Sequence, residues 1–107
     1  MSAASSVAPV FAALGDETRL RLVGRLSSGK PESIARLSEG SRLTRQAITK
    51  HLTVLSRAGL VRDRRVGRER VWRLEGRKLA EVRQYLERIS AQWDDALDRL
   101  KSFVEAT

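Results

Sequence analysis

The chain has 107 residues, of which 41% are hydrophobic, and this length and composition suit one domain with a small core. It contains 21 Lys and Arg residues against 13 Asp and Glu residues, so its formal net charge at pH 7 is +8. The absence of cysteine excludes disulfides and thiolate metal sites, and no stretch approaches the roughly 20 apolar residues of a membrane span.

The N-terminal residues predict a flexible start followed by a helix. Residues 1–6 are small and polar, and we expect them to form a flexible N-terminus before a single domain at 7–107. Residues 7–14 can form a short helix, which Gly15 ends. Asp16 then suits the N-cap of a second helix, because its carboxylate can accept a hydrogen bond from a free backbone N–H group.

Apolar spacing predicts the second and third helices. The residues expected to point into the core are Leu20, Val23 and Leu26 in the second helix and Ile34 and Leu37 in the third. Gly29 closes the second helix, and Pro31 suits the first turn of the third. Gly40 then supplies a turn.

The fourth predicted helix has one apolar and one polar face. It lies in the segment LTRQAITKHLTVLSRAGLV at 43–61, where Thr44 suits the N-cap. The residues expected to face the core are Ile48, Leu52 and Leu55. The residues expected to face outward are short, polar or basic, namely Arg45, Gln46, Thr49, Lys50 and Thr53. Two short helices joined by a tight turn in this way indicate a helix-turn-helix, and an ordinary helical hairpin remains the alternative.

Two short β-prone runs follow this helix. Residues 60–66 and 69–74 are separated by Gly67, which predicts a hairpin with a tight turn. Trp72 and Leu74 share one face of the second run, and we expect that face to lie on the helices. The hairpin also carries six arginines: Arg62, Arg64, Arg65, Arg68, Arg70 and Arg73. A basic two-stranded wing beside a helix-turn-helix favours nucleic acid as the partner.

The positive charge is concentrated in the middle of the chain. Residues 1–41 hold five basic and four acidic side chains, a balance of +1, whereas residues 42–78 hold twelve and three, a balance of +9. Residues 79–107 hold four and six, a balance of −2. This clustering predicts a surface for polyphosphate, with a solvated Arg-rich surface as the alternative. Membrane binding is disfavoured because the basic segment lacks a long apolar stripe.

One long helix is predicted at 77–104, because no Gly or Pro interrupts these residues. Apolar residues recur there at spacings of three and four, close to a heptad pattern: Leu79, Val82, Leu86, Ile89, Trp93, Leu97, Leu100 and Val104. So small a core cannot cover a helix of this length. We therefore expect it to pack on a partner chain, and the alternative is that it folds back on its own domain.

The inventory of reactive residues disfavours an enzyme. There is no Cys nucleophile, the only histidine is His51, and no Gly-rich phosphate loop is present. Residues 1–14 do not resemble a signal peptide, so we expect a cytoplasmic protein. Two binding alternatives remain besides a sequence-specific DNA-binding protein, namely a nonspecific DNA-compacting protein and a dimeric protein-interaction module.

Three segments resemble the ArsR/SmtB family of winged-helix repressors. ALGDETRLRLVGRL at 13–26 is similar to the family's second helix, residues 43–61 to its recognition helix, and VGRERVWRL at 66–74 to its wing. The resemblance extends over residues 7–104. It implies a mainly α winged helix-turn-helix with a small β-hairpin (α-α-α-α-β-β-α), whose first helix and terminal helix at 77–104 form the dimer interface.

The resemblance implies a homodimeric, sequence-specific repressor of double-stranded DNA. Its two recognition helices would enter successive major grooves of an inverted-repeat operator, with half-sites about 34–36 Å apart. The implied DNA-binding residues are Thr44, Arg45, Gln46, Thr49, Lys50, His51, Arg64, Arg65, Arg68 and Arg70. Among them Arg68, beside the wing turn, would reach the minor groove. The implied dimer-interface residues are Val7, Phe11, Leu79, Val82, Leu86, Ile89, Trp93, Leu97 and Leu100.

The sequence departs from the metal-sensing members of this family. Their thiolate site needs Cys, and this chain has none. Their site on the terminal helices needs His paired with carboxylates, but the only histidine here is His51, on the predicted recognition helix. Asp94, Asp95 and Asp98 form an acidic cluster, but carboxylates alone are poor ligands for zinc or nickel. We therefore predict a metal-independent repressor without a cofactor. A sensor of a metal or small effector through an unrecognised site is the alternative. Similar cysteine-free members are often encoded beside a START-like protein, which suggests local or autoregulatory control.

Overall fold

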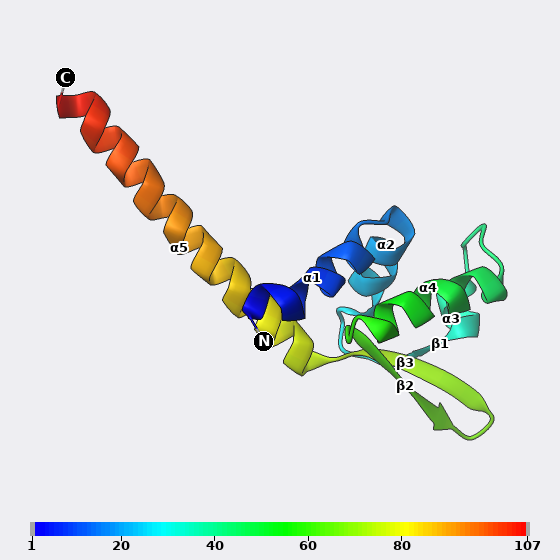
Figure 1. The fold of residues 1–107 in the computed structure, drawn as a ribbon. Helices are drawn as coiled ribbons and strands as arrows, with labels where there is room; N and C mark the ends of the chain where they lie inside the picture. The colour runs from blue at the N-terminus through cyan, green and yellow to red at the C-terminus, as the bar shows by residue number, and fades with distance from the viewer. Residues whose placement is uncertain (1, 107) are drawn as a thin grey trace.

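The computed structural model describes residues 2–106. The elements in chain order are α1 (Ala3–Leu14), α2 (Glu17–Leu26), β1 (Glu32–Ser33), α3 (Ile34–Ser38), α4 (Arg45–Arg57), β2 (Val61–Val66), β3 (Glu69–Leu74) and α5 (Gly76–Ala106). The first four helices and the sheet form one body, from which α5 extends as a single long helix (Figure 1). Within the described residues, no helix is both long and apolar enough to span a bilayer.

The fold is the winged helix-turn-helix that the sequence predicts, mainly helical with a small antiparallel hairpin. The sheet has a third, short strand that the sequence did not predict. Its strand order is β1-β3-β2, and β1 pairs antiparallel with β3 through Glu32 opposite Trp72. The hairpin itself pairs Val61 with Leu74 at its base and Val66 with Glu69 at its tip.

The placement of Pro31 in the third helix is wrong. Pro31 precedes β1, and α3 begins only at Ile34 with Ser33 as its N-cap. The Ser33 hydroxyl accepts a hydrogen bond from the Arg36 N–H at 3.2 Å. A proline suits the first helical turn and an extended segment equally well, and here the pairing of the next residues with β3 decides between the two.

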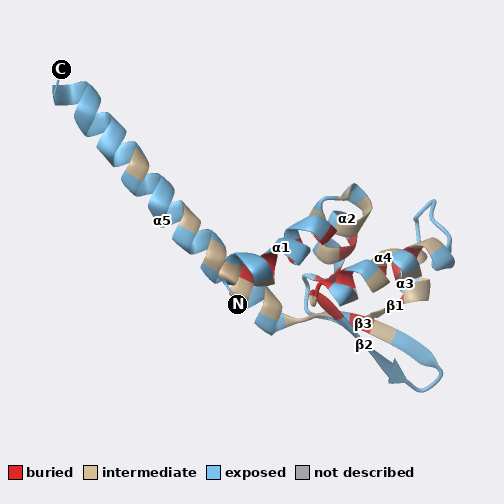
Figure 2. Ribbon diagram, viewed as in Figure 1, coloured by how far each residue is buried: buried red, intermediate tan, exposed pale blue. Residues whose placement is uncertain are grey.

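The core lies where α1, α2 and α4 meet the inner face of the sheet (Figure 2). Ile48, Leu52 and Leu55 of α4 are fully buried, as predicted, and so is Trp72 of β3. The predicted inner row of α2 is wrong at one position, because Leu20 is 53% exposed and Leu22 is buried in its place. Leu22 and Leu26, four residues apart, are the fully packed pair on this helix.

The first helix begins earlier than the sequence indicates. It starts at Ala3, with the Ser2 hydroxyl accepting a hydrogen bond from the Ser5 N–H at 3.2 Å. Most of the segment 1–6 that we expected to be flexible is therefore helical, because Ser2 caps it. Met1 lies outside the described residues.

The long terminal helix is confirmed, and its fold-back onto the body is excluded. Helix α5 spans 31 residues, and Val82 is the residue of α5 that is buried. Its second half lies away from the body, and nearly all of its described residues are exposed (Figures 1 and 2). Trp93 is 65% exposed there and Phe103 is 70% exposed. This part of the chain therefore has an apolar face that the protomer does not cover.

Candidate nucleic-acid interface

Helix α4 is fixed in rotation by its buried side. Thr44 is its N-cap, as predicted, and the Thr44 hydroxyl accepts a hydrogen bond from the Ala47 N–H at 3.0 Å. Gly40 takes a φ of 72° in the preceding turn, a conformation that favours glycine. Because Ile48, Leu52 and Leu55 occupy the core, the opposite side of α4 must face solvent.

The exposed side of α4 presents the side chains expected to meet DNA. Arg45, Gln46 and Lys50 are exposed, and within residues 2–106 no hydrogen bond or ion pair engages their side chains. Thr49 is different, because its hydroxyl donates to the Arg45 carbonyl at 2.8 Å. Arg45, Gln46 and Lys50 are therefore free to bind a ligand.

Arg57 belongs to the same face, although the sequence-based prediction did not include it. A shallow depression of about 320 Å³ is lined by residues that recur along α4, namely Thr49, Lys50, Thr53, Val54 and Arg57. The spacing of four residues from Thr49 to Thr53 and from Thr53 to Arg57 is the signal that could have found it. Arg57 extends the basic surface of α4 toward its C-terminal end.

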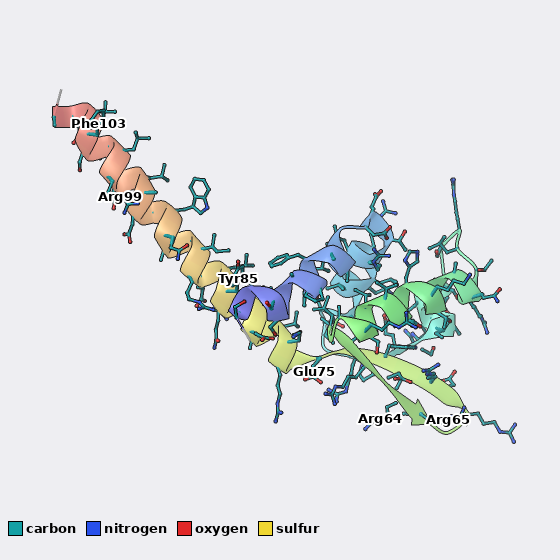
Figure 3. The ribbon with its side chains drawn as sticks, viewed as in Figure 1. Arg64, Arg65, Glu75, Tyr85, Arg99 and Phe103 are labelled. Atoms are coloured by element: carbon teal, nitrogen blue, oxygen red, sulfur yellow. The ribbon has the colours of Figure 1, made fainter. Side chains whose placement is uncertain are left out.

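The wing projects from the body beside α4 (Figure 1). Gly67, with a φ of 63°, makes the turn between β2 and β3. Arg64 and Arg65 lie toward the free end of the wing (Figure 3). Within the described chain, these two residues, together with Arg68 and Arg73, have no acidic partner. They leave four cations available on a narrow, solvent-exposed ribbon.

Comparison with known proteins agrees with this arrangement. Residues 14–64 match the helix-turn-helix domain family. The HTH-type transcriptional regulator Rv2034 of Mycobacterium tuberculosis is 35% identical over 106 residues, which cover 99% of this chain and 95% of that protein. The ArsR-like transcriptional regulator of Rhodococcus sp. RHA1 is 40% identical, with a TM-score of 0.81 over 97% of this chain and 94% of the other. The chain belongs to the ArsR family.

This family membership makes the chain a DNA-binding transcriptional regulator. A solved structure with lower sequence identity is similar to this chain in its fold alone. It is the homodimeric winged helix-turn-helix DNA-binding domain Mb0332 of Mycobacterium bovis, 23% identical, with a TM-score of 0.65 over 82% of this chain and 81% of that one. In the present ArsR-family chain, the basic wing and the polar side of α4 are both exposed and form the candidate DNA interface.

Besides Thr44 and Thr49, two further predicted DNA-binding residues, His51 and Arg70, make contacts inside the regulator. The His51 Nδ1 atom lies 3.3 Å from the Arg19 guanidinium and 3.9 Å from the Asp16 carboxylate, at the start of α2. Arg70 pairs with Asp63, and its guanidinium lies 5.0 Å from the centre of the Trp72 ring. His51 thus joins α4 to α2, and Arg70 stiffens the wing. Neither side chain is as free for DNA as Arg64 or Arg68.

The contact at the start of α2 predicts a specific acid response. The Arg19 N–H donates to the Asp16 carboxylate at 3.0 Å, and this bond, with the charges of Arg19 and His51, lowers the pKa of Asp16 below its ordinary 3.8. A folded-state pKa below the unfolded one adds stability above pH 3.8 that is lost as the pH falls through the folded value. In thermal unfolding at stepped pH, Asp16→Asn should therefore be less stable than the wild type at pH 7, and the difference should vanish once the pH falls below the lowered pKa of Asp16. A difference that stays constant with pH would contradict this account.

Among the described residues, no group of three or more His, Asp or Glu side chains is arranged to hold a metal ion. Asp94, Asp95 and Asp98 lie exposed on the distal part of α5. They are charged residues of a solvent-facing helix, and their placement bears on how two helices can pair.

Proposed function

We propose that this ArsR-family regulator is a homodimeric repressor that pairs through α5 and binds an inverted-repeat operator without sensing metal. The observation that carries the proposal is the uncovered apolar face of α5. Of the predicted interface residues, Phe11 of α1 and six residues of α5 are at least partly exposed: Leu79, Leu86, Ile89, Trp93, Leu97 and Leu100. Phe103 extends the same apolar side. Soluble monomers rarely leave so long an apolar surface open to water.

Two of the predicted interface residues are buried within the protomer, which changes the role that we assign to them. Val7 is 1% exposed and Val82 is 9% exposed, and both belong to the core of the protomer itself. They hold α1 against the first turns of α5. A partner helix would therefore meet the surface that they support and not their own side chains.

The charges on α5 favour an antiparallel pair. Residues 76–90 carry four basic and two acidic side chains, a balance of +2, whereas residues 91–106 carry two and four, a balance of −2. An antiparallel arrangement places the basic half of one helix beside the acidic half of the other, and a parallel arrangement places like charges together. Asp94, Asp95 and Asp98 supply most of the acidic half.

The DNA contacts follow from the free side chains of α4 and the wing. Arg45 and Gln46 lie in the first turn of α4, where Arg can bind guanine and Gln can bind adenine through two hydrogen bonds. Lys50 and the wing arginines suit phosphate oxygens, and Arg68 suits a narrow minor groove. A twofold dimer then reads two half-sites about 34–36 Å apart.

Sequence selectivity and salt dependence test this proposal together. A titration of the chain's own promoter fragment and of scrambled DNA at physiological salt should give affinities that differ by at least about 10³-fold. Raising salt from 50 to 200 mM should weaken operator binding by about 10³-fold if six or more phosphates are contacted. Equal affinity for both DNAs would indicate a nonspecific DNA-compacting protein. An operator affinity that does not change with salt would contradict the proposed phosphate contacts.

Metal independence has a separate test. Operator affinity should be the same in the presence of a chelator and in the presence of added zinc, because the described residues offer no cluster of metal ligands. Fluorescence anisotropy with a labelled operator measures both conditions directly. A reproducible tenfold change would mean that the regulator senses metal through a site of another kind.

A further inference from the structure

A polar cluster joins the first turn of α5 to α1. It consists of Ser6, Lys78 and Glu81. The Lys78 ammonium donates to the Glu81 carboxylate at 2.9 Å, to the Ser6 hydroxyl at 3.2 Å and to the Ser6 carbonyl at 3.3 Å. The Ser6 hydroxyl in turn donates to Glu81. All three ammonium N–H groups thus have an acceptor, and the Lys78 side chain is only 22% exposed.

The aliphatic part of Lys78 contacts the end of the recognition helix. Gly59 follows the C-cap of α4 with a φ of 85°, and a Cβ atom at Gly59 would lie 3.2 Å from Lys78 Cε. The neighbouring Glu75 N–H donates to the Leu60 carbonyl at 2.8 Å. Lys78 therefore contacts three elements at once, because it lies on α5, binds α1 and covers the turn after α4.

Other contacts also hold the start of α5, among them the ion pair between Arg62 Nε and Glu75 Oε2, which are 2.7 Å apart. Glu75 marks the start of the attachment region and Tyr85 its far end, beside α1 (Figure 3). Tyr85 packs against Phe11 with ring centres 6.4 Å apart, and Val82 lies in the core. Beyond these turns α5 extends free of the body (Figure 1). The angle between α5 and α4 thus depends on one short attachment region.

A small change in the angle between α5 and α4 produces a large displacement of the distal part of α5. The midpoint of α5 lies near residue 91, about 20 Å from Lys78 at about 1.5 Å per residue. A tilt of about 10° about Lys78 moves that midpoint by about 3.5 Å, which matches the rise of about 3.4 Å per base pair. In a dimer whose α5 helices pair near their midpoints, the displacements of the two protomers add, and their sum changes the distance between the two recognition helices.

We propose that Lys78 is a positioning residue for DNA recognition, which fixes the angle between α5 and α4 and thereby selects the spacing of the two operator half-sites. This inference rests on the homodimer proposed above. Lys78 need not touch DNA to act in this way. Its ammonium holds α1, and its stem holds the turn that ends the recognition helix.

Operators with altered half-site spacing test the role of Lys78. The full chain is titrated with duplexes in which one or two base pairs are inserted between the half-sites or deleted, and with a duplex that holds a single half-site. One base pair displaces a half-site by about 3.4 Å and rotates it by about 34°. The wild type should lose about tenfold or more in affinity for each altered spacing.

In Lys78→Met the loss of affinity at each altered spacing should shrink to less than about threefold, so that the profile of affinity against spacing becomes flat. Methionine keeps a side chain over Gly59 but has no ammonium group. Affinity for the single half-site should stay within about twofold of the wild type. Ser6→Ala provides a second variant that removes one acceptor and keeps good helix propensity, and it should flatten the profile partly. Arg77→Met is the matched control, since it removes one charge from the same turn of α5 and should keep the steep profile.

The outcomes separate this inference from the proposed function. A wild type that ignores spacing overturns the twofold operator and the role of Lys78 together. A wild type with a steep profile that Lys78→Met and Ser6→Ala retain overturns the role of Lys78 alone. If both variants lose half-site affinity and thermal stability in parallel with spacing selectivity, Lys78 supports the fold and does not set the spacing. Flattening confined to the spacing series supports the inference.

Discussion

Replacing Leu97 and Leu100 with glutamate is expected to convert the regulator into a monomer and to weaken operator binding by at least about 10²-fold. Both side chains are more than half exposed in the protomer, so the change should leave the core intact. Burying a leucine contributes about 1.5–3 kcal/mol, and a pair of helices would lose four leucines. In the antiparallel pair the new carboxylates would also be buried in the apolar seam, where an unpaired charge is costly.

The loss of affinity follows from the coupling between two half-sites. Once one half of a dimer is bound, the second half binds at a high effective concentration, and this gain disappears for a monomer. Sedimentation equilibrium measures the oligomeric state, and anisotropy with the operator measures affinity. The control is Ala91→Glu with Ser102→Glu, which adds the same charges on the opposite side of α5. A glutamate variant that stays dimeric would exclude α5 as the interface.

The elements with strong local signals were predictable from the sequence. Helix α4 has an N-cap at Thr44, a regular apolar row and a glycine after its end, and each of these signals depends on residues close in sequence. The hairpin has a glycine turn and alternating faces, and α5 is uninterrupted over its whole length. The polar side of α4 could be predicted from the apolar row of the same helix, because the side that is buried determines which side faces solvent.

The features that were missed depend on contacts between distant residues. The two residues of β1 become a strand only by pairing with β3, and no two-residue segment carries that information. Three-residue spacing selected Leu20 in α2, where packing against the neighbouring elements buries Leu22. His51 was placed with its DNA-facing neighbours, although its position on α4 turns it toward Asp16 and Arg19. Sequence spacing assigns a face, and tertiary packing decides what that face meets.

The apolar row of α5 gives the same lesson for the candidate interface. One row of apolar residues contains both Val82, which is buried against α1, and Leu97, which lies beyond the body and is exposed. A heptad pattern does not distinguish a core within the protomer from a seam between protomers. The distinction depends on where the body ends along α5, which is a property of the folded chain.

Gln46→Ala and Arg68→Ala are expected to weaken DNA binding in two different ways. A side chain that binds a base through two hydrogen bonds contributes about 1–3 kcal/mol of discrimination, and a dimer uses it twice. Gln46→Ala should therefore lower operator affinity by about 10²-fold or more while leaving the affinity for scrambled DNA nearly unchanged. It should also relax the preference at one base pair in each half-site, which binding-site selection from random DNA would reveal.

Arg68→Ala should instead weaken binding to operator and scrambled DNA by similar factors, because the minor groove that Arg68 would enter attracts it mainly through the negative potential of the phosphates. The slope of log affinity against log salt should fall by about one for each phosphate that an arginine no longer neutralises. Gln46→Ala should leave that slope unchanged, since glutamine is neutral, so each variant serves as the control for the other. If Gln46→Ala reduced both affinities equally, Gln46 would contact only the backbone, and sequence reading would have to rely on Arg45 or on another part of the exposed surface.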